Sequence, residues 1–120
     1  MPSRLERYQD KYRSLTAELC EMGFIIPGSL VLRETSCGKP GCKCQADPPR
    51  LHGPYYQWSR AAEGKTVSRR LTPAEAALYE EWIANRHRLK QIVAEMEEVS
   101  AAAGEILLRQ ADKDRSRTVR

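Results

Sequence analysis

Several features of membrane and secreted proteins are missing from this sequence. It contains no run of about 18 apolar residues, the length that a membrane-spanning helix needs. Its N-terminus, MPSRLERYQDKY, has no apolar segment of the kind found in secretory signals. We therefore expect a cytoplasmic protein. Because disulfides are rare in that compartment, we expect the cysteines to have a role other than forming structural disulfide bonds.

The content of apolar residues is modest. Hydrophobic residues make up 41% of the 120 residues, and only one residue is a phenylalanine. A chain of this length has room for one small domain, and a small core often needs a staple or a partner subunit. The sequence also lacks internal repeats and low-complexity tracts, which excludes repeat architectures.

The N-terminal stretch carries the pattern of an amphipathic helix. Ser3 and Glu6 match a capping box, which marks a helix start. Apolar residues then recur at alternating spacings of three and four, and Gly23 ends the pattern. The sequence predicts a helix over 3–22.

A longer helix is predicted over 73–111. Thr72 and Glu75 match a second capping box at its start. The apolar spacing then continues for four heptads, with Asn85 as a polar residue in the seam. We expect this helix to pack antiparallel on the first one, and we expect the polar tail at 112–120 to be disordered.

The long helix has more apolar seam than the first helix can cover. About 38 helical residues span roughly 57 Å, against roughly 30 Å for a helix of about 20 residues. The uncovered part predicts a homodimer or a helical protein partner, and a kink near Gly104 with a frayed end is the alternative. The seam residues assigned to this contact are Leu89, Ile92, Met96, Val99 and Ile106.

Three strand candidates lie between the helices, at 29–36, 54–61 and 65–71. A short AEG turn separates the last two, so they are expected to form a hairpin. The elements together predict an α+β fold in a single domain over 1–111. A small antiparallel three-stranded sheet with a zinc knuckle would occupy 29–71, flanked by the two helices as a coiled-coil hairpin.

Three of the four cysteines gather in CGKPGCKC, and a histidine follows eight residues later. Cys37, Cys42, Cys44 and His52 form a C-x4-C-x-C-x7-H set. Three thiolates and one imidazole are an accepted tetrahedral ligand set for zinc. We predict that these four residues bind Zn2+. The alternatives are free thiols beside a hydrogen-bonded histidine, and disulfide or redox chemistry.

The same cluster argues against catalysis. A catalytic zinc usually keeps an open position, whereas four candidates fill the coordination shell here and no glutamate lies beside His52. Cys44 with His52 could form a nucleophile–base pair, but nothing singles that pair out. We therefore expect no catalytic residue and no enzymatic activity. Cys20 is expected to be a small buried residue, and His87 a solvated one.

The basic residues are concentrated in the middle of the chain. Residues 29–72 carry a net charge of +5, while 1–28 are neutral and 73–120 carry −1. The strand residues expected to pack on the long helix are Tyr56, Trp58, Val67 and Leu71. The cationic residues are expected either to be merely solvated or to bind phosphates, and tyrosines can contact the backbone or stack on bases.

These features predict a nonenzymatic, zinc-stabilised accessory protein that binds nucleic acid, with DNA favoured over RNA. The residues assigned to the contact are Arg33, Lys39, Lys43, Tyr55, Arg60, Lys65, Arg69 and Arg70. The alternative is a protein-interaction adaptor that acts through the long helix, with a purely structural zinc module.

Four segments carry a resemblance to a known family: CGKPGCKC, LHGPYYQWSR, GKTVSRRLTP and EWIANRHRL. Over about 27–98 they resemble small uncharacterised bacterial proteins that carry a domain-of-unknown-function label and often occur around mobile elements. The resemblance implies a bacterial cytosolic protein and no established activity. The sheet followed by G-K-x-V and T-P-x-E-A is also similar to the three-stranded DNA-binding modules of some phage-type integrases.

Overall fold

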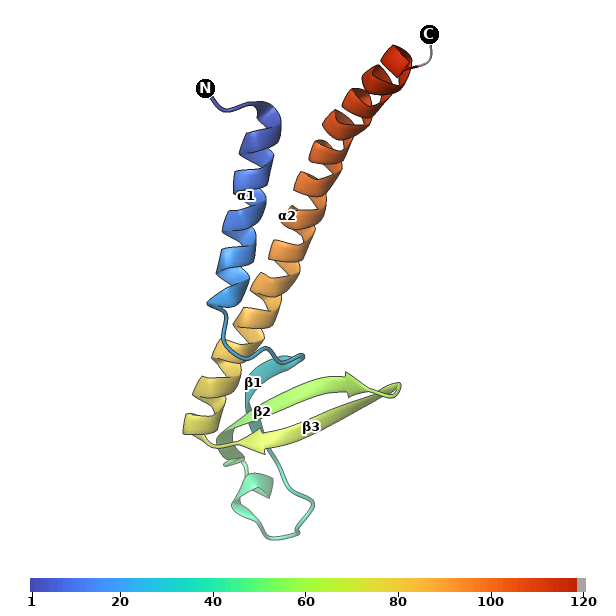
Figure 1. The fold of residues 1–120 in the computed structure, drawn as a ribbon. Helices are drawn as coiled ribbons and strands as arrows, with labels where there is room; N and C mark the ends of the chain where they lie inside the picture. Colours follow the sequence, from blue (N-terminus) through green and yellow to red (C-terminus); the bar gives the residue numbers. More distant parts are fainter. Residues whose placement is uncertain (119–120) are drawn as a thin grey trace. The chain divides into compact units, whose positions relative to one another are not determined.

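The chain forms a helix, three strands and a long second helix (Figure 1). The computed structural model describes residues 1–118. The elements in order are α1 (Arg4–Cys20), β1 (Ser29–Thr35), the 3-10 helix η1 (Lys43–Gln45), β2 (His52–Ala62), β3 (Lys65–Leu71) and α2 (Pro73–Thr118). This order confirms the predicted fold class. Among the described residues, no helix is both long enough and apolar enough to cross a membrane.

The contacts within the chain group it into two units, and α2 belongs to both. Unit 1 comprises Met1–Gly23 and the part of α2 from His87 onward. Unit 2 comprises Phe24–Arg86, which includes the sheet and the first turns of α2.

In unit 1, α1 runs antiparallel to α2. Ser3 caps α1 as predicted, because the Glu6 backbone N–H donates to the Ser3 hydroxyl over 3.1 Å, which is one half of a capping box. Near the end of α1, the Glu18 carboxylate accepts from Arg88 over 2.6 Å. The apolar seam buries Leu15 and Ile92, which are 3% and 0% exposed. These contacts place successive turns of the two helices side by side in opposite directions.

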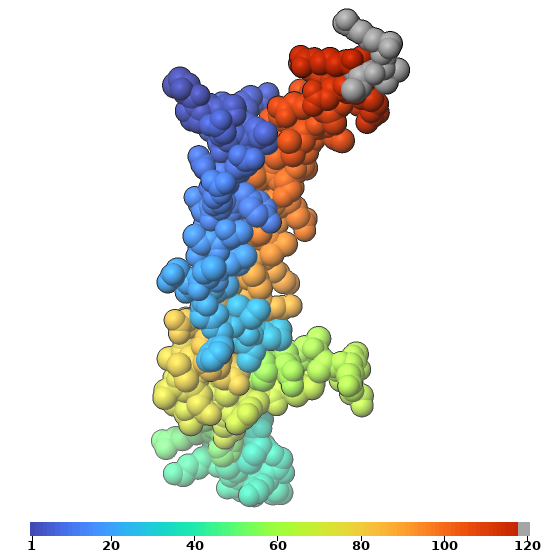
Figure 2. Space-filling view, viewed as in Figure 1, coloured from blue at the N-terminus to red at the C-terminus, as the bar shows by residue number. Residues whose placement is uncertain are grey.

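The three strands form one antiparallel sheet in the order β1-β2-β3. Trp58 in the central strand lies opposite Leu30 on one side and Arg69 on the other. Strand β2 begins at His52, earlier than the predicted residue 54, so the histidine is itself a strand residue. In the space-filling view, the β2–β3 hairpin and the cysteine loop are separate projections of unit 2 (Figure 2).

The core of unit 2 forms where α2 covers one face of the sheet. Trp58, Leu71 and Ala76 are buried there. The Trp58 indole N–H donates to the Pro27 carbonyl over 2.8 Å, which satisfies its polar atom. Half-buried apolar residues pack around this core, namely Ile26, Leu30, Tyr56, Tyr79 and Ile83.

Helix α2 starts as predicted but ends later. The Thr72 backbone N–H donates to the Glu75 carboxylate over 2.9 Å, and the Glu75 N–H donates back to the Thr72 hydroxyl. The predicted disordered tail was wrong as far as Thr118, because 112–118 continue the helix and 119–120 lie outside the described residues. An Asp112–Arg115 ion pair spans one turn of this extension, and no proline interrupts it.

Candidate metal centre

The cysteine loop leaves the sheet at one strand and returns at the next. Thr35, the last residue of β1, pairs with His52, the first residue of β2. Gly53 allows this close approach, because its φ is +107° and a Cβ there would lie 2.7 Å from the Arg33 carbonyl oxygen. The histidine ring is therefore presented beside the cysteines of the loop.

Cys37, Cys42, Cys44 and His52 converge on one point. One ligand atom from each residue lies within 4.8 Å of all the others. The Cys37 and Cys44 sulfurs are 3.5 Å apart, and the Cys42 sulfur is 3.2 Å from His52 Nε2. Metal–sulfur bonds of ~2.3 Å would put tetrahedral ligands ~3.8 Å apart. The side chains are therefore compatible with a four-ligand metal site.

Hydrogen bonds prepare Cys44 to be a thiolate. Its side chain is 3% exposed, and its sulfur accepts the Cys37 backbone N–H over 3.2 Å. The Gln45 side-chain amide also donates to this sulfur and to the Cys37 carbonyl. The Cys37 N–H is the main reason why the pKa of the Cys44 thiol is lowered to about 7. A thiol with such a pKa loses its proton readily to a bound metal.

Cys37 behaves in the opposite way. The Lys39 backbone N–H acts to lower the pKa of the Cys37 thiol, but the neighbouring thiols of Cys44 and Cys42 leave that pKa raised. The two sulfurs thus share a proton unevenly, with the thiolate favoured at the buried Cys44. A cation would remove this competition, because it favours the deprotonated form of every thiol.

A surface hollow of about 620 Å³ adjoins the cluster. Cys37, Cys42 and His52 line it, together with residues from both ends of the loop and from β3. Its other lining residues are Thr35, Lys39, Gly53, Pro54, Tyr55 and Arg70. No described acidic residue lines this hollow. Lys39 and Arg70 contribute positive charge to its wall, and Thr35 and Tyr55 contribute hydroxyl groups.

The face of the sheet away from the unit 2 core is polar and continues into this hollow. Arg33 donates to the Gln57 side chain over 3.3 Å, and the Ser59 and Ser68 hydroxyls lie 2.9 Å apart. The chain of contacts thus crosses all three strands. We call this surface the open face.

At the hollow, the open face ends in an aromatic–cation stack. The Tyr55 hydroxyl lies 3.4 Å from the Thr35 hydroxyl, and Arg70 lies over the tyrosine ring. The Thr35 hydrogen bond comes first among the causes that lower the pKa of Tyr55, followed by Arg70, with a smaller effect of Arg33. Only the two arginine contributions reflect positive charge at this end of the open face, because the Thr35 hydroxyl is neutral.

A family model described as Domain of unknown function (DUF6788) matches residues 1–81. The chain belongs to this family. The DUF6788 match confirms the resemblance to an uncharacterised family, although it begins before the predicted 27 and ends before the predicted 98. It covers α1, the sheet and all four cluster residues. Neither the curated proteins nor the solved structures yield a match.

Within the DUF6788 region, the predicted nucleic-acid contacts do not form one surface. Arg33, Tyr55 and Arg70 share the open face, and Lys39 lines the adjoining hollow. The alternation of strand residues sends a second group to the face that α2 covers. That second group is Arg60, Lys65 and Arg69.

Two members of the second group, Arg60 and Arg69, lie close to residues of their own face. The Arg60 guanidinium lies over the Trp58 ring at 5.1 Å, and Arg69 lies near enough to Glu75 to contribute to the lowered pKa of that carboxyl, after the hydrogen bonds from Thr72. Lys43 belongs to η1 and does not line the hollow. The alternation within β2 and β3 was visible in the sequence, but the place of Lys39 beside Arg70 depends on how the loop folds.

Four open-face residues were missed by the sequence reasoning. Thr35, Gln57, Ser59 and Ser68 are polar but uncharged, so charge counting did not select them. Gln57 and Ser59 alternate with the buried Trp58, and Ser68 with Arg69. That period of two was the available signal.

The predicted association residues are only partly accessible. Ile92 is fully buried in unit 1, and Leu89, Met96, Val99 and Ile106 are half-buried. Leu107 and Leu108, which the heptad pattern did not select, are 50% and 63% exposed. Apolar residues are thus exposed on a different face of the late turns of α2.

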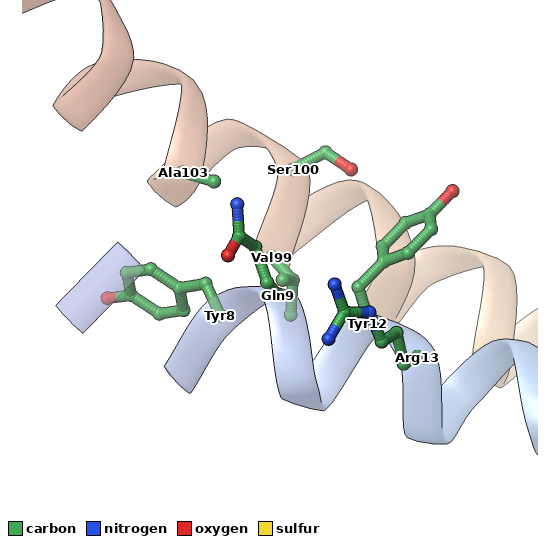
Figure 3. Close-up of a pocket in the computed structure, with 7 residues that line it drawn as sticks. All are labelled: Tyr8, Gln9, Tyr12, Arg13, Val99, Ser100 and Ala103. Atoms are coloured by element: carbon green, nitrogen blue, oxygen red, sulfur yellow. The ribbon is translucent and has the colours of Figure 1, made fainter. Parts of the chain in front are cut away.

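A further hollow of about 290 Å³ lies between α1 and α2 in unit 1. Figure 3 shows Tyr8, Gln9 and Tyr12 of α1 beside Val99 and Ala103 of α2. Its lining is mostly apolar and aromatic and brings no metal ligand. This hollow is a gap in the helix seam.

Three expectations outside the predicted sites can be compared with the structure. Cys20, expected to be buried, is exposed at the last turn of α1, because it lies off the seam. Val67, expected to pack on α2, is 41% exposed. It pairs with Arg60 near the hairpin turn, beyond the core residues. His87 is exposed, as predicted.

Proposed function

We propose that the protein is a zinc-stabilised, nonenzymatic accessory protein that binds nucleic acid, with DNA favoured over RNA. The observation that supports this function is the cationic end of the open face. Arg33, Lys39 and Arg70 gather there, and none of the three pairs with a carboxylate among the described residues. Unpaired cations on a polar face favour phosphate binding, because they release counterions from the nucleic acid.

Zinc is the metal that best suits the cluster. Three sulfurs and one imidazole form a soft donor set, and zinc accepts this set in a closed tetrahedral site. A closed site has a structural role, since no position is left for a substrate. The four residues would tie the end of β1 to the start of β2 and so hold the cationic end of the open face in place.

Metal analysis of protein purified without chelator tests this part. We expect one zinc per chain. Cys42→Ser should lower zinc content and thermal stability, whereas Cys20→Ser, which alters an exposed thiol outside the cluster, should change neither. Protein that carries no zinc after purification without chelator would contradict the zinc proposal.

Neighbouring arginines provide a matched test of nucleic-acid binding. Arg70 lies on the open face and Arg69 on the face that α2 covers, so either substitution by alanine removes the same charge. The proposal assigns no nucleic-acid contact to Arg69. We expect Arg70→Ala to weaken duplex binding and to reduce the salt slope by about one, and Arg69→Ala to leave both nearly unchanged.

Fluorescence polarisation with a labelled duplex, repeated over a range of salt concentrations, measures both quantities. The same titration with single-stranded DNA and with RNA distinguishes the kinds of nucleic acid. Equal losses in the two arginine variants would mean that only the overall charge matters. No binding at about 50 mM salt would contradict the function itself, because phosphate contacts are strongest at low ionic strength.

The second candidate function is a protein-interaction adaptor, and one observation favours it. Leu107 and Leu108 expose apolar surface on the late turns of α2. Such residues are suited to a second copy of the chain or to a helical partner. An adaptor would bind no nucleic acid at low salt and would retain one protein in a pull-down. A mass measurement in solution tests the proposed homodimer, which Leu107→Lys should weaken.

A further inference from the structure

We propose that the hollow beside the cysteine cluster is a binding site for a phosphate group. Arg70, Lys39 and the hydroxyls of Thr35 and Tyr55 would surround the phosphate oxygens. Phosphate binding at the hollow rests on the proposed function, because it names the part of the nucleic acid that this end of the open face would hold.

The hollow has room for a phosphate group that belongs to a larger molecule. Its volume of about 620 Å³ lies within the ~300–1,000 Å³ typical of ligand pockets. Its wall combines a loop, two strand ends and β3, so donors approach from several directions. A concave site with convergent donors holds an anion better than isolated surface cations do.

Arg70 is held in place before any ligand arrives. Its backbone pairs with Gln57 in the sheet, and its guanidinium lies 3.8 Å from the centroid of the Tyr55 ring. A guanidinium fixed in this way loses little freedom when it donates two hydrogen bonds to a phosphate. The stack also occupies the tyrosine ring, so Tyr55 is poorly placed to stack on a base. The hollow therefore favours phosphate over base recognition.

The simplest competing explanation is that these cationic side chains only neutralise the negative charge of the metal-bound cysteines. Three thiolates with a divalent ion leave one negative charge, whereas Arg33, Lys39 and Arg70 supply three positive charges. The cations therefore exceed what neutralisation needs. Lys39 and Arg70 also line the hollow itself, where an incoming anion would reach them.

Two lysines of the same loop give a matched test. Lys39 lines the hollow and Lys43 does not, yet either substitution by alanine removes one charge near the cluster. The experiment titrates the zinc-loaded full chain with inorganic phosphate at constant ionic strength and follows backbone amide signals by NMR. We expect shifts at Thr35, Gly53 and Tyr55. Lys39→Ala should weaken binding about two- to fivefold, and Lys43→Ala should leave it unchanged.

A second arm identifies the source of the phosphate. Oligonucleotides with and without a 5′-phosphate are compared on the same protein. Tighter binding of the phosphorylated strand, lost in Lys39→Ala, assigns the hollow to a terminal phosphate. Equal binding of both strands, weakened by Lys39→Ala but not by Lys43→Ala, assigns it to an internal phosphodiester.

Several results would overturn the phosphate site. Absence of phosphate-induced shifts around the hollow would do so, as would equal effects of the two lysine substitutions. Lower zinc retention in Lys39→Ala without weaker phosphate binding would show that the cations serve the metal alone. Duplex binding could depend on Arg70 while inorganic phosphate shifts no NMR signal around the hollow. That result would overturn the phosphate site and leave the proposed nucleic-acid binding intact. Phosphate binding without any nucleic-acid binding would support the phosphate site and contradict the proposed function.

Discussion

The guanidinium carbon of Arg70 lies 3.8 Å from the centroid of the Tyr55 ring. Tyr55 belongs to β2 and Arg70 to the neighbouring β3, and the Tyr55 hydroxyl lies near Thr35 of β1. One stack thus joins all three strands at the edge of the hollow. It also fixes the direction of the cation on which the proposed function depends most.

Loss of this stack should weaken nucleic-acid binding even though no charge is removed. We expect Tyr55→Leu to lower duplex affinity about two- to fivefold, because Arg70 would then be free to turn away from the hollow. Tyr55→Phe keeps the ring and loses only the hydroxyl, so its loss should be smaller. Polarisation titrations of the two variants measure the difference. Identical losses would show that the hydroxyl, and not the ring, is what matters.

The Cys44 thiol should titrate near neutral pH in metal-free protein. Its pKa falls from 9.0 to about 7 in the fold, so the thiolate stabilises the folded chain fully above about pH 9. That contribution is lost as the pH falls through about 7. Thiolate absorbance in the ultraviolet should show one early step, absent in Cys44→Ser and present in Cys20→Ser. A first step near pH 9 in the parent protein would contradict this assignment.

Gly28 should tolerate no side chain. Its φ is +108°, and a Cβ would lie 2.4 Å from the Ser59 carbonyl oxygen and 2.7 Å from the Trp58 indole nitrogen. The backbone conformation alone should make Gly28→Ala cost about 1–3 kcal/mol, and the contacts add to this. Gly104→Ala is the control, because it lies within α2 with nothing within 4 Å and should stabilise by about 0.5–1 kcal/mol. Urea denaturation gives both values, and a neutral Gly28→Ala would speak against this packing.

Ile92 should be the most sensitive apolar position of unit 1. It is 0% exposed, so Ile92→Ala should cost about 2–5 kcal/mol by opening a cavity in the helix seam. The adjacent Val93 is 41% exposed, and Val93→Ala should cost less than about 1 kcal/mol. Thermal unfolding followed by circular dichroism compares the two. Similar costs would mean that the seam does not run through Ile92.

Features set by local sequence could be predicted. Both helices start as expected, with one capping bond at Ser3 and a full capping box at Thr72, because these bonds reach only three residues along the chain. The cysteine and histidine cluster could also be predicted, since its spacing matches a known ligand set and one turn-rich loop holds three of its four members.

Features set by contacts between distant residues could not be predicted. Asn85 looked like a polar interruption of the seam, yet its amide donates to the Phe24 carbonyl over 2.9 Å. The hollow depends on Lys39 and Arg70 meeting across more than thirty residues of chain. The end of α2 was misjudged for another reason, because a polar composition resembles that of a disordered tail even where it can continue a helix.

The placement of the two tryptophans has a practical consequence. Trp58 and Trp82 both contact Tyr79, and all three belong to unit 2, whereas unit 1 contains no tryptophan. Tryptophan fluorescence therefore reports on the sheet and its covering turns alone, and the ellipticity of the two helices comes largely from unit 1. Following both signals while a chelator is added would separate loss of the sheet from loss of the helix pair, without any label attached to the protein.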